Sequence, residues 1–438
     1  MRIAIIGTGI AGNAAAWLLG REHRITVYEK EPRPGGHAHT VDINYDGTTI
    51  AVDTGFIVYN TANYPNFTAL LDHLKVETVE SDMSFAVTSG RGDFEWSGQQ
   101  GSFSHVLNAV FAQRSNVLSP RFWRMLRDMT RFNTKAIADR AAGRLSGLSL
   151  GDYLTREGFS GPIVEDYLVP MAAAIWSTPV DQIMRFPAEN FIAFFDNHRL
   201  IHWNRPRWRT VKGGSRSYVE RLVAANSDRI RFSTAVTAIY RRSNGVEVVD
   251  AHGVHETYDQ VIIATHSDEA LALLADPSPA EASVLGAIRY RPNDVYLHRD
   301  TRLMPKRRRA WSAWNFIRDG SRGGAGQEVA ISYWMNALQG IDADKPLFVT
   351  LNPPTPPAPA LTFRRFAYSH PQYDLAAFAA QRQLDTIQGA RRTWFCGAWA
   401  GYGFHEDGLK AAITVARQLG VAPPWETNPA GVVSEAAE

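Results

Sequence analysis

The feature that most constrains the fold of this chain is a Gly-x-Gly-x-x-Gly pattern near the amino terminus. An apolar run at residues 3–6 predicts a buried parallel strand before it, and residues 13–19 predict a helix after it. In this context Gly7 allows a tight turn, Gly9 lets a pyrophosphate approach the backbone, and Gly12 lets helix and strand pack closely. A glycine-rich turn that binds no ligand is the alternative interpretation.

Two further features indicate which nucleotide this turn would bind. A second strand, at residues 24–28, ends at Glu29, where an acid is expected on a ribose hydroxyl. Two adjacent glycines beside a basic residue then make a second backbone cradle for phosphate, in the segment Arg33-Pro34-Gly35-Gly36-His37. A nicotinamide-binding domain needs no such second cradle, whereas FAD is longer and must be contacted at several separated places. The sequence therefore predicts FAD, with helix N–H groups around Ala11 at its phosphates.

Length and composition exclude several classes of protein. With 438 residues the chain is too long for one compact core. Its 46 basic and 44 acidic residues give a net charge of +2, and no nucleic-acid motif is present, so nucleic acid is not an expected partner. Cys396 is its single cysteine, which excludes a disulfide framework, a cysteine zinc site and an iron–sulfur cluster; no metal site is predicted. The amino terminus does not resemble a signal peptide and no apolar run is long enough to span a bilayer, so a cytoplasmic location is expected.

The alternation of patterns along the chain predicts an α/β fold with interleaved parts. A Rossmann-like FAD-binding domain is expected to alternate with a substrate domain of antiparallel sheet plus helices. Residues 230–236 predict a strand of the nucleotide domain. In the helical subdomain, the helical spacing of Phe103 and Leu107 predicts that they occupy core positions. The predicted segments are FAD-binding parts at 1–60, 206–281 and 386–421, a helical subdomain at 61–205, a sheet at 282–385 and a disordered tail at 422–438.

The second glycine segment resembles the Arg-x-Gly-Gly segment of flavoproteins of the amine oxidase, protoporphyrinogen oxidase and carotenoid desaturase superfamily, which usually carry Arg where His37 stands here. The resemblance implies a glutathione-reductase-type domain of amine oxidase topology. It also implies that Gly397 ends a strand beneath the cofactor and that a helix from Gly408 points at the flavin ring. Ala398 stands where the superfamily has an acid for the ribityl chain, so Glu406, Asp407 or a backbone group is expected there. The remaining implied contacts are Gly55, Phe56 and Ile57 beside the ring and the backbone at Val236 near the adenine.

Across nearly its whole length the chain resembles one subgroup of that superfamily, the predicted FAD-binding proteins associated with cyclopropane fatty acid synthases. The stretches that carry this resemblance are residues 34–40, 53–56, 174–177, 333–336 and 401–408. The association implies an acyl chain, bound in a phospholipid, as substrate, and a lipid methyltransferase as a possible partner. Aromatic side chains are dense between residues 176 and 208, and such a surplus favours an apolar cleft, although a packed core is the alternative.

Three functions follow as hypotheses. The first is FAD-dependent removal of two hydrogens from a fatty acyl chain, with His198, His405 or Tyr333 as proton acceptor; each of these is alternatively a buried structural residue. The second is amine oxidation with release of hydrogen peroxide, in which Trp399 and Tyr402 flank the amine. The third is a non-catalytic flavoprotein that accompanies a lipid methyltransferase. A second nucleotide domain is not expected, because Gly323-Gly324-Ala325-Gly326 lacks a strand–helix context.

Residues 306–309 form a basic cluster between Met304 and Trp311. Basic and apolar side chains together are typical of segments that contact lipid headgroups, which predicts peripheral contact with the inner membrane surface. A solvated basic loop is the alternative.

Overall fold

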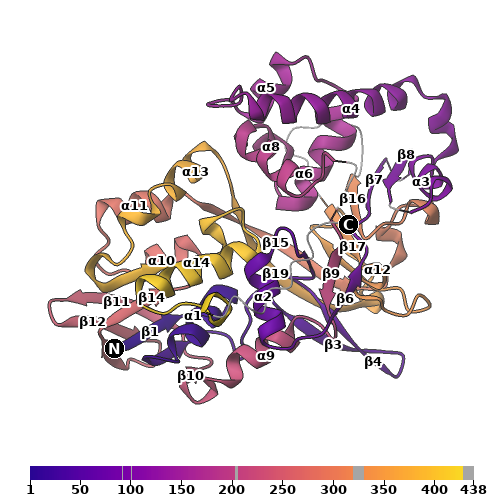
Figure 1. Ribbon diagram of the computed structural model, residues 1–438. Helices are drawn as coiled ribbons and strands as arrows, with labels where there is room; N and C mark the ends of the chain where they lie inside the picture. The colour runs from indigo at the N-terminus through magenta and orange to yellow at the C-terminus, as the bar shows by residue number, and fades with distance from the viewer. Residues whose placement is uncertain (91, 100, 203–205, 319–329, 428–438) are drawn as a thin grey trace.

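The computed structural model describes residues 1–427 except 91, 100, 203–205 and 319–329, and residues 428–438 also lie outside the described part. Its nucleotide sheet contains five strands that all pair in parallel, in the order β10-β2-β1-β14-β20. These strands come from three distant parts of the chain, and this interleaving confirms the predicted α/β fold class (Figure 1). Their bounds are β1 (Arg2–Ile6), β2 (Arg24–Tyr28), β10 (Ile230–Arg231), β14 (Gln260–Ile263) and β20 (Thr393–Phe395).

Helices cover the nucleotide sheet and join its first and last segments. Helix α1 (Ile10–Leu19) packs against β1, α9 (Arg216–Ala224) and α14 (His405–Gln418), so almost all of its residues are buried. The contact between α1 and α14 brings the amino-terminal glycine turn beside the carboxy-terminal segment. Helices α10 (Ser267–Leu273), α11 (Pro279–Gly286) and α13 (Leu375–Gln381) lie farther along the same side of the molecule (Figure 1).

A seven-stranded sheet in the order β19-β15-β18-β17-β16-β7-β8 forms the second body. Its pairs are antiparallel except for β16 with β7, which are parallel. The prediction of a purely helical segment at 61–205 is wrong here, because β7 and β8 come from that segment and complete the sheet. The bounds are β7 (Phe85–Ser89), β8 (Phe94–Gly98), β15 (Arg289–His298), β16 (Trp314–Arg318), β17 (Ala330–Trp334), β18 (Phe348–Leu351) and β19 (Thr362–Gln372).

Above this sheet in Figure 1 lies a group of helices that contributes several buried aromatic side chains to the core. A capping box between Ser149 and Asp152 begins α5, because the two side chains each accept from the other residue's backbone N–H. The helices are α4 (Pro120–Ala141), α5 (Leu150–Arg156), α6 (Val169–Trp176), α7 (Val180–Met184) and α8 (Ala188–Asn197). Helices α2 (Pro65–His73), α3 (Phe103–Val110) and α12 (Met335–Gln339) lie outside this group.

Three small sheets accompany the two bodies, and the one that contains β11 and β12 lies on the side of the nucleotide sheet away from the second body (Figure 1). The first is a hairpin of β3 (Thr40–Tyr45) and β4 (Thr48–Asp53). The second has the strand order β5 (Val58–Asn60), β9 (Trp208–Val211) and β6 (Thr78–Ser81). The third has the order β11 (Val236–Arg242), β12 (Gly245–Asp250) and β13 (His255–Tyr258). The prediction of one strand over 230–236 is wrong. Ser233 has a φ of 50°, in the left-handed region, and this turn separates β10 in the nucleotide sheet from β11 in the small sheet.

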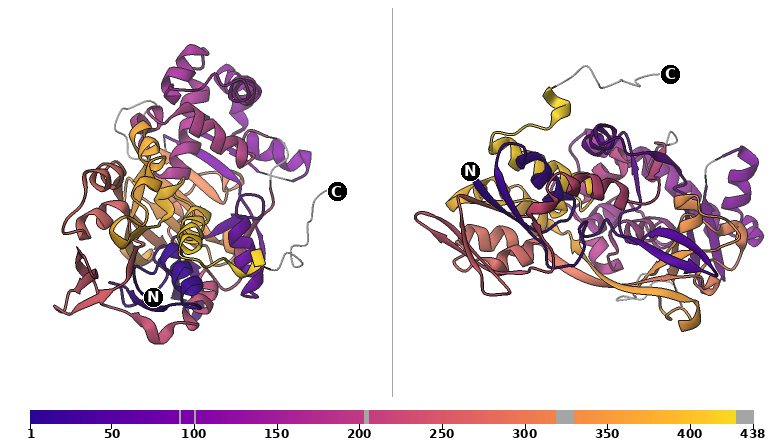
Figure 2. Two further views of the ribbon diagram at one scale, coloured as in Figure 1. Left: turned by 60° about the vertical axis from the view of Figure 1, so that its left-hand side comes forward. Right: turned by 90° about the horizontal axis from the view of Figure 1, so that it is seen from below.

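The predicted disordered tail is also corrected in part. Residues Pro424–Thr427 form the short helix α15, and the Trp425 ring stacks on Trp17 at a centroid distance of 6.2 Å. The rest of that segment, 428–438, lies outside the described residues, as does the Gly323–Gly326 stretch (Figure 2). In the part of the chain that the structure describes, no helix is both long and apolar enough to cross a membrane.

Candidate cofactor and active site

The glycine turn after β1 leaves an open space above the start of α1. Gly7 has a φ of 97°, and a Cβ atom built on Gly12 would lie 1.9 Å from the Gly7 carbonyl oxygen, so neither position accepts a side chain. A Cβ atom built on Gly9 would instead meet nothing within 4 Å. No side chain caps the first turn of α1, where Ala11 lies, and its N–H groups are therefore available to a phosphate.

The second glycine segment packs directly against the first. The Gly35 N–H donates to the Thr8 carbonyl oxygen at 2.8 Å, and a Cβ atom on Gly36 would lie 3.1 Å from the Gly9 α-carbon. The Arg33 guanidinium donates to the Gly36 carbonyl oxygen at 3.1 Å, which holds the turn in shape and keeps a positive charge beside it. The structure thus brings together the two predicted phosphate cradles into one continuous backbone surface.

His37 presents a buried polar atom at this surface. Its backbone carbonyl accepts from the Phe56 N–H at 2.8 Å, and Gly55 must be glycine because a Cβ there would lie 2.1 Å from that same oxygen. The His37 Nε2 atom is buried and has no hydrogen-bond partner among the described residues. Burial, and then the nearby His370 and His266, lower the pKa of His37 well below its usual value. An orphaned ring nitrogen beside two glycine cradles fits a large polar cofactor, and FAD meets these requirements.

Glu29 and the start of β11 lie together at the predicted adenosine side. The Glu29 carboxylate accepts from the Thr8 N–H at 2.8 Å and from the Glu31 N–H at 2.9 Å. Its backbone carbonyl accepts from the Thr234 N–H at 2.8 Å, which places Val236 two residues farther along the same segment. The carboxylate therefore already orients the glycine turn, and its bond to a ribose hydroxyl stays a prediction, as does the adenine contact of Val236.

The carboxy-terminal segment approaches the same surface through two glycines. A Cβ atom on Gly397 would lie 2.4 Å from the Trp399 indole nitrogen, and one on Gly408 would lie 2.8 Å from the Ile10 side chain. Gly408 therefore allows α14 to pack on the first residue of α1. Cys396 is buried, and burial raises the pKa of its thiol to about 12, so this side chain is an inert thiol of the core.

Glu406 and Asp407 bind protein donors at the start of α14. Glu406 accepts from the backbone and the side-chain amide of Asn66 and from the Phe67 N–H, at 2.7–3.0 Å, and so caps α2. Asp407 accepts from the N–H groups of Tyr402 and Phe404 at 3.0 and 2.9 Å. Their role at the ribityl chain stays a prediction, and the structure shows that both carboxylates also organise the turn around it.

We expect Asp407→Asn to change how stability depends on pH. Burial is the largest influence on the Asp407 carboxyl and raises its pKa from 3.8 to about 6. Because the Asp407 carboxyl has a higher pKa in the folded than in the unfolded protein, its protonated form stabilises the fold below pH 3.8. This contribution is lost as the pH rises through about 6. Asn keeps an acceptor oxygen without this penalty, so the variant should gain on the wild type across that window, by about 3 kcal/mol once the pH exceeds 6. Unfolding free energies measured at several pH values test this, and a difference independent of pH would contradict it.

The three predicted proton acceptors lie in different surroundings. The His405 ring stacks on Phe56 at 3.8 Å, its Nε2 is hydrogen-bonded to the Tyr218 hydroxyl, and burial lowers its pKa to about 3. Ile57 and the edge of Phe67 also belong to this packed region. His405 is therefore a poor proton acceptor that packs α14 on the core. Its catalytic role, and the flavin contacts of Gly55, Phe56 and Ile57, stay predictions.

His198 and Tyr333 lie outside this packed region, at the end of α8 and in the seven-stranded sheet. His198 stacks on Phe194 at 3.9 Å, hydrogen-bonds the Phe194 carbonyl through Nδ1 at 3.0 Å, and has its pKa lowered to about 4 by burial. Tyr333, in β17, meets the Trp314 ring edge-on at 4.8 Å, and burial raises its pKa. Both side chains are neutral at pH 7, and their part in proton transfer stays a prediction.

Sequence reasoning missed a cluster of histidines beside His37. The rings of His266 and His370 lie 5.9 and 5.8 Å from it, and Tyr368 lies 5.1 Å from it. His370 and Tyr368 come from β19, for which the sequence offers no signal of proximity. His266 follows β14, and the carboxyl end of a parallel strand is where ligands bind in such sheets, so its position was a usable signal.

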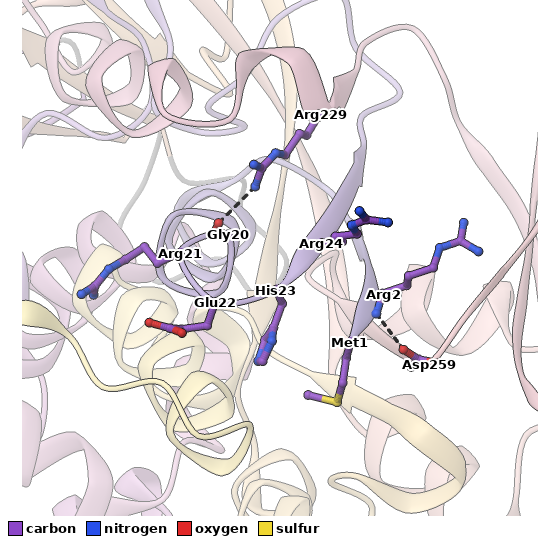
Figure 3. A pocket seen from close by; sticks show the side chains of 9 residues that line it. All are labelled: Met1, Arg2, Gly20, Arg21, Glu22, His23, Arg24, Arg229 and Asp259. Carbon is purple, nitrogen blue, oxygen red and sulfur yellow. Dashed lines mark hydrogen bonds between the residues drawn. The ribbon is translucent and has the colours of Figure 1, made fainter.

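A shallow surface hollow lies at the opposite edge of the nucleotide sheet (Figure 3). It is lined by Met1, Arg2, Gly20, Arg21, Glu22, His23, Arg24, Arg229 and Asp259. These residues surround the amino ends of β1 and β2, whereas nucleotides bind at the carboxyl ends of parallel strands. The hollow is therefore separate from the cofactor site. No group of three or more His, Cys, Asp or Glu side chains placed to hold a metal occurs within the described ranges.

The fold and the paired glycine cradles define a protein of the FAD-binding α/β class, and comparison with known proteins agrees. The family model for flavin containing amine oxidoreductases matches residues 10–307. The carotenoid phi-ring synthase of Streptomyces griseus is 34% identical over 169 residues, which are 36% of this chain and 31% of that protein. The matched region thus spans about a third of this curated relative.

Solved structures show the same fold at low sequence identity. A fatty acid isomerase from P. acnes, which produces CLA, matches with a TM-score of 0.62 and 14% identity, over 95% of this chain and 98% of that one. Cyclohexylamine oxidase from Brevibacterium oxydans matches with a TM-score of 0.65 and 14% identity, over 96% and 99%. The chain belongs to the flavin containing amine oxidoreductases, a family of FAD-dependent oxidoreductases, and FAD is its cofactor.

Proposed function

We propose that this protein removes two hydrogens from an apolar substrate, a fatty acyl chain, methylated or not, that is carried by a phospholipid. The observation that carries the proposal is a neutral aromatic layer beside the start of α14. Phe194 lies at its centre, with Trp176 at 4.8 Å, Phe404 at 5.1 Å and Tyr402 at 5.6 Å between ring centroids. Phe186, Phe191 and Phe378 extend the same layer.

The polar side chains beside this layer are neutral or engaged by partners in the protein. The histidine in contact with it, His198, is neutral because burial lowers its pKa to about 4. The carboxylates of Glu406 and Asp407 accept from backbone and amide donors, and Asp196 of α8 pairs with Arg140. Aromatic and uncharged surroundings favour an apolar chain, since a buried ammonium group would need a carboxylate partner.

The residues of this chain would bind, orient and protect the reacting groups. FAD, when bound, supplies the electron-accepting chemistry. The paired glycine cradles with Arg33 and His37 would hold its phosphates, and the start of α14 would place partial positive charge near the ring. The aromatic layer would exclude water from the acyl chain, and the neutral imidazole of His198 would take a proton as a weak base, since burial lowers its pKa to about 4. Tyr333 is the poorer acceptor, because burial raises its pKa and keeps the phenolic proton in place.

The position of Trp399 does not favour the alternative function, amine oxidation. Trp399 and Tyr402 were predicted to flank an amine, but the Trp399 side chain is 2% exposed and its indole donates to the Thr265 carbonyl at 3.1 Å. The Trp399 indole is therefore held beneath Gly397, which gives the amine alternative less support from this residue. The names of the similar proteins include both apolar and amine substrates, so they do not decide between the two functions.

Anaerobic mixing of the FAD-loaded protein with defined lipids tests the proposal. We expect loss of the oxidised flavin absorbance with phospholipids that carry methylated, unsaturated or cyclopropane acyl chains, and no change with the headgroup alcohols alone. Bleaching by polyamines or aromatic amines, with hydrogen peroxide formed on admission of air, would replace this function with amine oxidation. No bleaching by any lipid, together with a stable complex with a lipid methyltransferase, would favour the non-catalytic partner.

A further inference from the structure

Five of the eight large apolar side chains that are exposed among the described residues come from one stretch of the chain, residues 103–123. Among the described residues, Phe103 is 80% exposed, Leu118 is 85% exposed and Trp123 is 50% exposed, and Leu107 and Val117 are exposed as well. The predicted core role of Phe103 and Leu107 is therefore wrong. Clusters of this kind are unusual on a monomeric surface and mark sites of interaction.

Local structure holds these side chains on one face. Ser102 caps α3, and the i, i+4 spacing sets Phe103 and Leu107 on its outer side while Ala109 is buried. The Trp123 indole donates to the Val117 carbonyl at 2.8 Å, and its ring lies 5.6 Å from Phe111. The short 3₁₀-helix Arg114–Leu118 and the first turn of α4 are thereby joined to α3.

Basic residues border this apolar region. Helix α3 contacts the 3₁₀-helix Arg308–Ala310, and the Gln99 amide donates to the Trp311 carbonyl at 3.0 Å. Arg307 is held by the buried Glu95, whereas Arg308 lies over the Trp311 ring at 3.7 Å. Lys306, Arg308 and Arg309 are exposed, so most of the basic cluster faces outward.

The segments that form this surface are poor in acidic residues, and the exposed Asp93 lies just before them. Residues 96–127 and 301–317 contain no Asp or Glu. Arg121 pairs with Glu165 and Asp166. Arg124 and Arg127 pair with Asp128 of the same helix, the first residue after this stretch. Arg114, Lys306, Arg308 and Arg309 have no carboxylate partner among the described residues. An uncompensated positive charge therefore lies beside the exposed apolar groups, although the whole chain has a net charge of only +2.

We propose that this α3 face, which consists of Phe103, Leu107, Val117, Leu118, Trp123 and the basic residues Arg114, Lys306, Arg308 and Arg309, docks on a bilayer that contains anionic lipids. Apolar and aromatic side chains would enter the interface while Lys and Arg contact the headgroups. A second copy of the chain fits less well, because a symmetric contact would bring the same basic residues together. The proposal does not depend on the proposed reaction, since docking is measured without turnover.

Flotation of the FAD-loaded protein with vesicles tests the proposal. We expect binding to mixed phosphatidylglycerol–phosphatidylcholine vesicles at low salt, little binding to phosphatidylcholine alone, and release at high salt. The double substitution Phe103→Ser/Leu118→Ser should weaken binding by at least about tenfold, because two apolar side chains no longer enter the interface. Lys306→Gln/Arg309→Gln should weaken it by roughly tenfold and reduce its salt dependence.

Matched controls come from exposed residues elsewhere. Leu375→Ser removes an apolar side chain that is 50% exposed, and Arg21→Gln/Arg24→Gln removes two charges from the hollow of Figure 3; both variants should bind as the wild type does. Absence of binding to anionic vesicles at low salt would overturn the proposal. Equal losses of binding in the control variants would also overturn it. Self-association that the Phe103→Ser/Leu118→Ser variant abolishes would overturn it as well, since the face would then be an interface between copies.

Discussion

Gly9→Val is expected to yield a folded protein that does not bind FAD. The backbone at Gly9 has φ −63° and ψ −178°, an extended conformation that valine adopts readily, and a Cβ atom there meets nothing within 4 Å. The side chain would instead occupy the space into which the pyrophosphate must come. We expect FAD affinity to fall by more than about a hundredfold, with circular dichroism and unfolding temperature of the apoprotein unchanged.

Neighbouring glycines provide the controls for this prediction. Gly12→Ala should impair folding itself, because its Cβ would lie 1.9 Å from the Gly7 carbonyl oxygen and push α1 off the sheet. Gly286→Ala, in α11, meets only the Leu271 side chain at 3.5 Å and should bind FAD normally. Flavin absorbance after gel filtration with excess FAD separates the three outcomes. If the Gly9→Val protein retained flavin absorbance, the pyrophosphate would not pass over this turn.

Asp53→Ala is expected to produce the largest loss of stability. Asp53 is 1% exposed, and its carboxylate accepts from the Thr40 hydroxyl at 2.6 Å, the Ser215 N–H and hydroxyl at 2.9 and 2.7 Å, and the Gln339 amide at 3.1 Å. These donors come from the first nucleotide segment, the second nucleotide segment and the substrate sheet. Alanine would leave them buried without an acceptor, at a cost of about 3–5 kcal/mol.

A second aspartate in the same hairpin serves as the matched control for Asp53. Asp42 binds Arg216 through two hydrogen bonds of 2.6 Å, but its side chain is 48% exposed and solvent screens the pair. Asp42→Ala should therefore cost no more than about 1 kcal/mol. Urea unfolding of both variants measures the difference, and equal stabilities would show that the Asp53 network does not join the segments as the geometry indicates.

Prediction from sequence succeeded where a local pattern requires one local structure. The turn from Gly7 to Gly12 and the Asp46-Gly47 hairpin formed as predicted, because the left-handed φ values of Gly7, Asp46 and Gly47 suit these residue types. It failed at Ser233, whose left-handed turn divides a β-like stretch, and at Phe103, whose helical spacing is amphipathic but whose apolar side faces solvent. Periodicity shows that a helix has an apolar side, not what that side contacts.

The candidate site depends on contacts that no local pattern records. Glu406 and Asp407 are predicted at the cofactor, and the structure adds that they also bind α2 and the preceding turn. His266 and His370 were missed because they reach His37 from β14 and β19, far from it in the chain. Trp399 was placed beside a substrate, but the absence of a side chain at Gly397 lets its indole enter the core.

By itself, the sequence determined the cofactor and the class of fold, because glycines in a strand–turn–helix context must leave room for a pyrophosphate wherever the rest of the chain goes. Only the tertiary structure decided which side chains surround that space, which carboxylates are already occupied, and that α3 turns its apolar side outward beside Lys306 and Arg309. These outcomes depend on packing between segments hundreds of residues apart, and such packing is set by the whole core rather than by any one stretch.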